Sequence, residues 1–339
     1  MKRMAIVLVL AVIGVLLCSC HSGGTLQRRH VSTDQSSLRS TSAEEGRHRK
    51  PSRPDALHGE HRLGLLLAAH GSPRPQWNEQ LVALENEVRA LLNVKDSSPF
   101  RMIRVGMMEF AEPTIASVLQ DMELHGVQEV YVLPLLIAPS SHSVFDLPAI
   151  LGLYSDSRIR DQLQAEGNTI AATNMRVTLG PTLNYGAVLK EVMLDRARDL
   201  SRKPQSEGIV LLAHGDPLFA PFWESLCQEI GFFVCAHTGI PIFDFAFVEM
   251  GQTFIPDGVP AIRRVAERCQ RTLVLGLYVN TSVQGMIDRW ELSDGQVVLR
   301  APEMLADHRV TFAEHGLLPS ERIASWITER AMEWVSGRR

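Results

Sequence analysis

Short apolar segments alternate with longer amphipathic segments from about residue 62 to the C-terminus. The apolar segments have the length of strands, and the amphipathic segments show the spacing of helices. This alternation is typical of βα units built on a parallel sheet. In the first half we predict strands at residues 63–69, 102–107, 129–137 and 175–179. In the second half we predict strands at residues 208–213, 241–247, 272–279 and 296–300.

The two halves of this pattern repeat each other with a period of roughly 140 residues. LGLLLAAHGSP at the start of the first half matches GIVLLAHGDP in the second, and Glu109 falls opposite Glu249. The fold class we predict is therefore α/β, with two tandem domains, each a parallel sheet flanked by helices, related by pseudo-twofold symmetry. The domains span residues 62–203 and 204–339, and a polar, proline-containing stretch at 201–206 joins them.

The N-terminus has the pattern of an export signal. Lys2 and Arg3 precede an apolar run of about fifteen residues that ends in small residues and cysteine. The run is short for a membrane span, which takes about 20 apolar residues, although an uncleaved anchor is the alternative. Ser19 before Cys20 resembles the lipobox of bacterial lipoproteins, in which the cysteine is lipidated. We expect residues 1–19 to be a lipoprotein signal peptide and the exported chain to be anchored to a bacterial membrane through Cys20, on the periplasmic or cell-surface side.

Residues 20–61 are rich in Ser, Thr, Arg, Gly and His, with almost no large apolar side chains. Such a segment cannot offset its ordering entropy by burial, so we predict a disordered tether. The chain of 339 residues, 45% hydrophobic overall, is long enough to fill two cores. Its net charge of -4 and scattered arginines argue against a nucleic-acid partner. For the three cysteines of the body we favour buried thiols over a disulfide such as Cys227 with Cys235, the third being Cys269.

Three polar residues follow the predicted strands of the first half at their carboxyl ends. His70 comes directly after the first strand, Glu109 after the second, and His142 in the loop after the third. Ligands of open α/β sheets bind beyond the carboxyl ends of the strands, so these residues converge on one rim. Two imidazoles and a carboxylate suit a first-row divalent metal, and the carboxylate can also accept protons. The alternative is that His70 caps the following helix and His142 bonds only to backbone.

Further residues extend this site or repeat it. Asp146 either caps the following helix, which we favour slightly, or orients an imidazole as a partner behind the metal ligands. The second half keeps His214 and Glu249, but Gln284 stands where His142 would repeat. We therefore expect the second half to be degenerate and to complete the wall of the cleft without binding an ion of its own.

Three stretches of the first half resemble the sirohydrochlorin cobaltochelatase family, small tetrapyrrole chelatases that use no ATP. They are LLLAAHGSPRPQWNEQL, MMEFAEPTIASVL and EVYVLPLLIAPSSHSVFDLP, in the order that the family shows. The resemblance implies that His70 and His142 hold the incoming metal and that Glu109 removes pyrrole protons. It also implies a tetrapyrrole as partner and a divalent metal as substrate, cobalt first, with nickel, iron or zinc as alternatives.

Two departures from the family keep other functions open. The loop before the second histidine is usually rich in glycine, whereas here it reads Ser140-Ser141. Sirohydrochlorin is metallated in the cytosol, whereas the N-terminal signal predicts export. The first hypothesis is therefore a lipid-anchored chelatase, and the second is an exported protein that binds metal or tetrapyrrole without turnover. A scaffold with neither activity would leave the convergence of His70, Glu109 and His142 unexplained.

Overall fold

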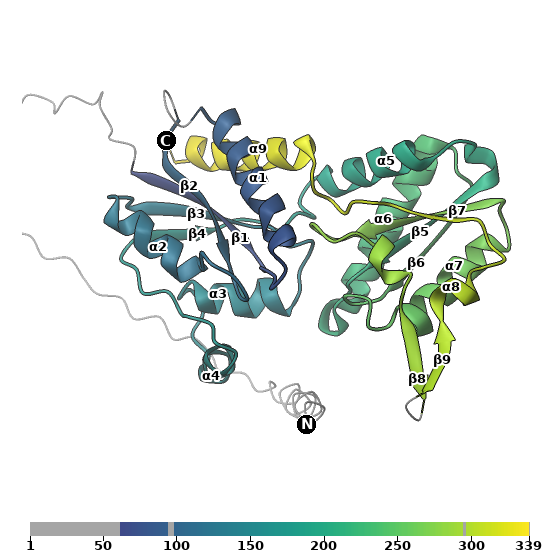
Figure 1. Ribbon diagram of the computed structural model, residues 1–339. Coiled ribbons are helices and arrows are strands. Elements are labelled where there is room, and N and C mark those ends of the chain that lie inside the picture. Colours follow the sequence, from purple (N-terminus) through teal and green to yellow (C-terminus); the bar gives the residue numbers. More distant parts are fainter. Residues whose placement is uncertain (1–61, 94–97, 294–295, 339) are drawn as a thin grey trace, which may run out of the picture. The chain divides into compact units, whose positions relative to one another are not determined.

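Two four-stranded parallel sheets form the framework of the protein, as the computed structural model shows for residues 62–93, 98–293 and 296–338 (Figure 1). The first sheet has the order β2-β1-β3-β4, and the second has the order β10-β7-β5-β6. Strands of the first sheet are β1 (Leu63–Ala69), β2 (Phe100–Met107), β3 (Glu129–Pro134) and β4 (Arg176–Leu179). Strands of the second are β5 (Glu207–Ala213), β6 (Ile242–Phe247), β7 (Arg271–Leu277) and β10 (Val310–Phe312).

The two sheets have the same topology, because β1, β2, β3 and β4 occupy the positions of β5, β6, β7 and β10. The central strands are buried along almost their whole length, which explains why they read as unbroken apolar runs. The α/β class and the helix-flanked parallel sheets predicted from the sequence are confirmed. The pseudo-twofold symmetry stays a prediction.

The predicted strand at residues 296–300 exists but does not belong to the parallel sheet. It is β9 (Gln296–Arg300), which pairs antiparallel with β8 (Trp290–Ser293) in a separate hairpin. The fourth position of the second sheet is taken by the three-residue strand β10, parallel to β7. The prediction that residues 296–300 complete the sheet is therefore wrong. The hairpin carries exposed apolar side chains, namely Trp290, Leu292 and Val297, so an apolar run at this place does not mark a buried strand.

Helices cover both faces of each sheet. Those of the first half are α1 (Pro75–Leu91), α2 (Ile115–Leu124), α3 (Leu147–Ile150), α4 (Ser157–Ala165) and α5 (Val188–Leu200). Those of the second half are α6 (Ala220–Thr238), α7 (Val259–Ala266), α8 (Ala301–Met304) and α9 (Glu321–Ser336). Local sequence sets several ends: the Thr114 side chain accepts a hydrogen bond at the start of α2, and Gly239 ends α6 in a left-handed conformation.

The last helix of each half packs on the sheet of the other half. Helix α5 contacts α6 and β7, although it precedes the second sheet in sequence. Helix α9, the last element of the chain, returns to α1 and β3 of the first sheet (Figure 1). There Trp334 stacks on Tyr131, with ring centroids 5.0 Å apart. The predicted boundary between residues 203 and 204 thus falls between α5 and β5, while the packing of α5 and α9 crosses it.

Three clusters of buried apolar side chains make up the core. One contains residues from both sheets and from α1, α5, α6 and α9, and the other two lie on the remaining face of each sheet. Cys227, Cys235 and Cys269 are free thiols, of which Cys227 is buried as predicted, whereas Cys235 and Cys269 are only partly buried. No helix in the described part of the chain has the length and apolar character to span a bilayer. The predicted signal peptide, Cys20 and the tether lie outside the described residues.

Candidate metal centre

The loops after the first three strands of the first sheet bring His70, Glu109 and His142 together. His70 follows β1, Glu109 lies two residues after β2, and His142 opens a π-helical turn, His142–Asp146, in the loop after β3. Backbone bonds join the first two loops, from the Met108 amide to the Ala69 carbonyl (2.8 Å) and from the Glu109 amide to the His70 carbonyl (3.0 Å). The predicted convergence on one rim of the sheet is therefore present in the structure.

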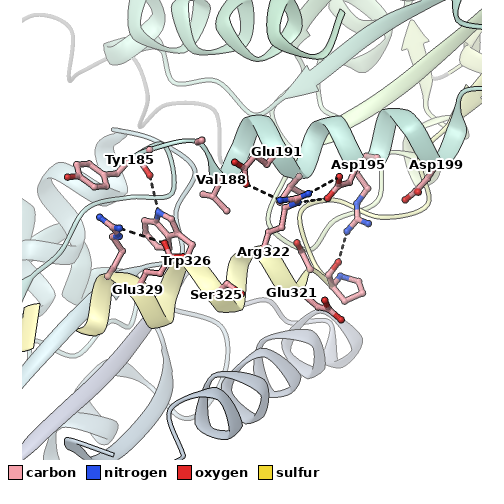
Figure 2. Close-up of a pocket in the computed structure, with 17 residues that line it drawn as sticks. Tyr185, Val188, Glu191, Asp195, Asp199, Glu321, Arg322, Ser325, Trp326 and Glu329 are labelled. Atoms are coloured by element: carbon pink, nitrogen blue, oxygen red, sulfur yellow. Dashed lines mark hydrogen bonds and ion pairs between the residues drawn. The ribbon is translucent and has the colours of Figure 1, made fainter. Parts of the chain in front are cut away.

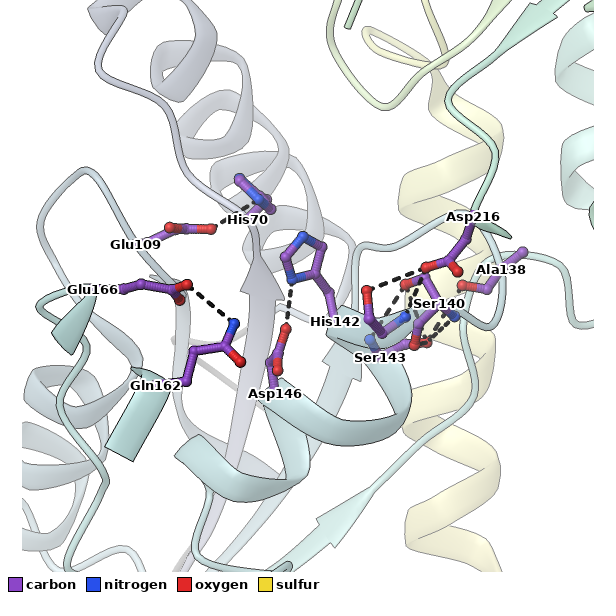
Figure 3. A network of polar contacts seen from close by, with 11 residues as sticks. His70, Glu109, Ala138, Ser140, His142, Ser143, Asp146, Gln162, Glu166 and Asp216 are labelled. Carbon is purple, nitrogen blue, oxygen red and sulfur yellow. Dashed lines mark hydrogen bonds and ion pairs between the residues drawn. The ribbon is translucent and has the colours of Figure 1, made fainter. Parts of the chain in front are cut away.

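The three side chains are close enough to share one ion. One ligand atom from each lies within 4.8 Å of the other two, and among the described residues they form the one such group of three. His70 Nε2 is 2.9 Å from Glu109 Oε1, and the two imidazole rings meet edge to face with centroids 4.9 Å apart. All three side chains remain partly exposed, which leaves the group open to an incoming ligand. Figure 3 shows the three side chains pointing toward one another.

Hydrogen bonds hold the outer nitrogen of each imidazole. His70 Nδ1 faces the carbonyl oxygen of Gly71 at 3.1 Å, and His142 Nδ1 faces Asp146 Oδ2 at 2.8 Å. An Nδ1 atom that donates to an oxygen leaves the lone pair of Nε2 for a metal, the arrangement that orients histidine ligands in metalloproteins. Both imidazoles therefore turn Nε2 to the space between the loops, where His70 Nε2 contacts Glu109 Oε1, a contact that a bound metal would replace.

Asp146 lies behind His142 because both belong to the same π-helical turn. A turn of this kind is wider than an α-helical turn and recurs at functional sites, and here it places residues four apart in direct contact. Although Asp146 precedes α3, its side chain makes no capping hydrogen bond to that helix. The capping role that the sequence favoured is therefore wrong, and the carboxylate contacts the imidazole.

The charges of the group favour an ionised carboxylate and a basic imidazole. Burial alone raises the pKa of Glu109, but the hydrogen bond from His70 and the positive charges of both imidazoles outweigh it, so the net pKa shift is downward. The hydrogen bond to Asp146 raises the pKa of His142, against the effect of burial. Glu109 is thus ionised at neutral pH, and His142 is a stronger base than an isolated imidazole.

Gly71 is required where the two loops meet. Its φ of +87° lies in the left-handed region, and a Cβ atom there would stand 2.0 Å from the carbonyl oxygen of Glu109. Only glycine lets the chain turn after His70 and approach Glu109 so closely. Phe110, directly after Glu109, is 63% exposed, and its ring centroid is 5.7 Å from that of His70. An apolar ring therefore borders the open side of the centre.

The corresponding loops of the second half do not build a second centre. His214 repeats the bond of His70, from Nδ1 to the next carbonyl at 2.8 Å, and the Glu249 amide bonds to the His214 carbonyl. Both side chains are exposed, however, and Gln284 begins a 3₁₀ turn where the first half has its π-helical turn. The structure thus places His214 and Glu249 at the equivalent rim without a third ligand.

Two cavities adjoin the centre. One of about 320 Å³ is bounded by Glu109 and Phe110, and another of about 470 Å³ lies beyond Phe110 and is lined mainly by apolar surface, including Pro73 and Val82. A larger cavity of about 810 Å³ lies elsewhere, between α5 and α9 (Figure 2). Arg322 crosses that cavity to pair with Glu191 and Asp195 of α5. Because Arg322 of α9 pairs across it with α5, we regard this cavity as a junction between the two helices rather than as the site.

Asp216 is the residue of this region that the sequence did not single out. It follows His214-Gly215 in the second half, yet its carboxylate reaches the loop that carries His142 (Figure 3). The one available signal was the difference between HGS in the first half and HGD in the second, which by itself indicates no partner.

Comparisons with known proteins show which family the first half is similar to. Residues 64–200, most of the first half, match the model of the CbiX family. A sirohydrochlorin cobaltochelatase of Saccharolobus solfataricus is 26% identical over 141 residues, which are 42% of this chain and 98% of that protein. Another, of Methanocaldococcus jannaschii, is 34% identical over 93 residues, 27% of this chain and 61% of that protein.

Solved structures extend the likeness in fold to both halves. The sirohydrochlorin chelatase SirB from Bacillus subtilis subspecies spizizenii, in complex with cobalt, aligns with 80% of this chain and 94% of its own, at 15% identity and a TM-score of 0.54. SirB from Bacillus subtilis with Fe³⁺ aligns with 80% and 95%, at 14% identity and a TM-score of 0.57. The resemblance to a chelatase family expected from the sequence is confirmed.

Proposed function

We propose, from the CbiX domain at residues 64–200, that this protein inserts a divalent metal ion into a sirohydrochlorin-like tetrapyrrole. The observation that carries the proposal is the group of His70, Glu109 and His142, whose ligand atoms lie within 4.8 Å of one another. Cobalt is the first candidate for the metal, because the curated relatives are cobaltochelatases. Nickel, iron and zinc also suit imidazole ligands.

Each residue has a distinct role in the reaction we propose. His70 and His142 hold the metal substrate through Nε2, with the remaining coordination positions filled by water and then by the macrocycle. Insertion replaces both inner N–H protons of the tetrapyrrole by one divalent ion. Glu109, whose lowered pKa keeps it ionised at neutral pH, accepts the two departing protons in turn and passes each to solvent through the exposed side of the loop.

Substitutions of the three residues test this assignment in the full-length protein. His70→Ala or His142→Ala should abolish Co²⁺ binding and the conversion of sirohydrochlorin to its metallated form, followed by absorbance. Gln284→Ala is the matched control, because Gln284 occupies the place of His142 in the second half and should leave both unchanged. Equal losses from all three variants would refute the assignment.

A second candidate is capture of metal or tetrapyrrole without turnover. The export signal that we predict in the first 20 residues would favour it, because metallation of sirohydrochlorin is a cytosolic step, and the glutamine at position 284 favours it as well. Glu109→Gln separates the two functions. It should spare Co²⁺ binding but slow insertion by about 10²- to 10⁴-fold if Glu109 is the base of an enzyme. A capture protein should be affected little, and wild-type protein would shift the spectrum without converting the macrocycle.

We further propose that Cys20 carries lipid and holds the protein on the outer side of a bacterial inner membrane or on an outer membrane. The support is the basic start, the apolar run and Ser19 before the cysteine. Wild-type protein should partition with membranes and incorporate labelled fatty acid, and Cys20→Ala should lose both. Incorporation that persists in Cys20→Ala would move the modification to Cys18.

A further inference from the structure

The loop that carries His142 is held by side chains from the second half. The Ser141 amide donates to Asp216 Oδ2 at 2.9 Å, and the Ser141 hydroxyl donates to the same oxygen at 3.2 Å. Trp223 Nε1 donates to the Pro139 carbonyl oxygen at 2.9 Å. These bonds fix the residues immediately before His142, as Figure 3 shows for Asp216.

The contact from Trp223 of the second half to the first half has a counterpart from the first half to the second, whereas the contact from Asp216 has none among the described residues. Trp77 Nε1 of the first half donates to the Thr281 hydroxyl at 2.9 Å, and Thr281 precedes Gln284 by the same three residues that separate Pro139 from His142. The tryptophans therefore hold the loop after the third strand in both halves.

Ser72 occupies the place of Asp216 in the first half, two residues after the histidine, but it bonds within its own half. Its amide and carbonyl pair with the Asn78 side chain. A carboxylate from the opposite half thus holds the loop that carries His142 but not the equivalent loop that carries Gln284.

The two oxygens of Asp216 have separate partners. Oδ1 accepts from the Leu218 amide at 2.9 Å and so anchors the carboxylate to the turn that follows His214. Oδ2 is left to accept both donors of Ser141. Hydrogen bonds to an ionised acceptor are roughly twice as strong as neutral ones, and two donors on one oxygen also restrict its direction. Asp216 therefore connects the turn after His214 to the Ser141 backbone, so the place of Ser141 depends on the place of the second half.

We infer that Asp216 is a positioning residue for the metal centre, through which the second half sets the place of the His142 imidazole relative to His70. This inference rests on the proposed function, because it takes His142 as a ligand for a divalent metal substrate. It also explains the departure from a glycine-rich loop: Ser141 supplies a hydroxyl donor that glycine lacks, and the loop gains a second bond to Asp216. The second half thus acts on the centre while lacking a full set of ligands itself.

Asp216→Ala in the full-length protein tests the inference, with Asp244→Ala as matched control. Asp244 also lies in the second half and also uses both oxygens, accepting from the Phe245 amide and from Arg264. We expect Asp216→Ala to raise the Kd for Co²⁺ about tenfold, the lower end of the effect of removing a residue that orients a metal ligand. Its unfolding midpoint should fall no further than that of Asp244→Ala, which should bind Co²⁺ as the wild type does.

A second readout does not depend on metal. Hydrogen exchange of the Ser141 amide in the metal-free protein should be at least tenfold faster in Asp216→Ala and unchanged in Asp244→Ala. Should Asp216→Ala fail to fold, Asp216→Asn replaces it. One amide oxygen can satisfy Leu218 or Ser141 but not both, so this variant should show a smaller shift in the same direction.

The outcomes separate the inference from the proposed function. Unchanged Ser141 exchange in a folded Asp216 variant overturns the inference, and so does an unchanged Kd when the wild type binds Co²⁺. If the wild type does not bind Co²⁺, the proposed function fails, and a positioning role at a metal centre fails with it. The exchange result then decides only whether Asp216 holds the loop.

Discussion

Removing the carboxylate behind His142 should weaken metal binding without unfolding the protein. In Asp146→Ala the 2.8 Å contact to His142 Nδ1 is lost, and the imidazole is free to rotate and to change tautomer. Loss of such a partner typically lowers metal affinity by about 10- to 100-fold, or about 1.4–2.7 kcal/mol. The His142 side chain is 40% exposed, so water can replace part of the lost contact. We therefore expect a loss near the lower end, about tenfold in the Kd for Co²⁺.

Competition with a colorimetric chelator at pH 8 measures this change, and the nitrogen chemical shifts of His142 report the tautomer. Asp121→Ala is the matched control, because Asp121 pairs with His125 at the same four-residue spacing, with Oδ1 3.1 Å from Nδ1, on an exposed face of α2. That variant should bind Co²⁺ with the affinity of the wild type. A wild-type Kd in Asp146→Ala, or an equal loss in both variants, would refute the view that Asp146 orients a metal ligand.

Three further substitutions or treatments test other features of the structure. Gly71→Ala should lower the free energy of unfolding by more than about 1 kcal/mol in urea titrations and weaken Co²⁺ binding, because its Cβ would strike the Glu109 carbonyl. Gly126→Ala is its control, since Gly126 also has positive φ but nothing within 4 Å of the added carbon, and it should leave Co²⁺ binding intact. Burial raises the pKa of Glu207, but bonds from Ser201, two backbone amides and Arg271 outweigh it, and its folded pKa is lowered. Its contribution is then full above the unfolded value of about 4.3 and is lost as pH falls through the lower folded pKa. Glu207→Gln should cost about 3 kcal/mol at pH 7 and flatten the fall in stability toward acid pH, and parallel curves for variant and wild type would contradict this. Burial raises the pKa of the Cys227 thiol to about 12, so iodoacetamide at pH 8 should label it only after denaturation, and rapid labelling of the folded protein would contradict its burial.

The apolar pattern predicted the sheets well because a central parallel strand is buried on both faces. β1 and β5 read as unbroken apolar runs, and the structure buries nearly every residue of each. The same criterion failed at residues 296–300, because the exposed hairpin carries apolar side chains such as Trp290 and Val297. The apolar pattern also did not predict β10, because its three residues are too few to form a recognisable apolar run.

The sequence predicted those residues of the candidate site that directly follow a strand of the first sheet. His70, Glu109 and His142 each follow a strand, and parallel strands place their carboxyl ends on one edge. Asp146 was assigned to the wrong contact, because the sequence does not indicate a π-helical turn. Asp216 was not predicted because its partner, Ser141, belongs to the other half of the chain. A contact between halves does not change the local pattern of apolar and polar residues, so the sequence does not show it.

The crossing of α5 and α9 also fixes an order of events in synthesis. The first sheet begins at Leu63, but the helix that stacks Trp334 on Tyr131 is synthesised only after the whole second sheet. Until then the part of the first sheet that α9 covers has only α1 beside it, so the first half reaches its full packing after the second half has been made. A chain ending before Glu321 would expose the apolar surface under α9, and a half expressed alone should aggregate or require the other half in trans. The loops that carry His70, Glu109 and His142 thus belong to a half whose packing is complete only after the second half has been synthesised.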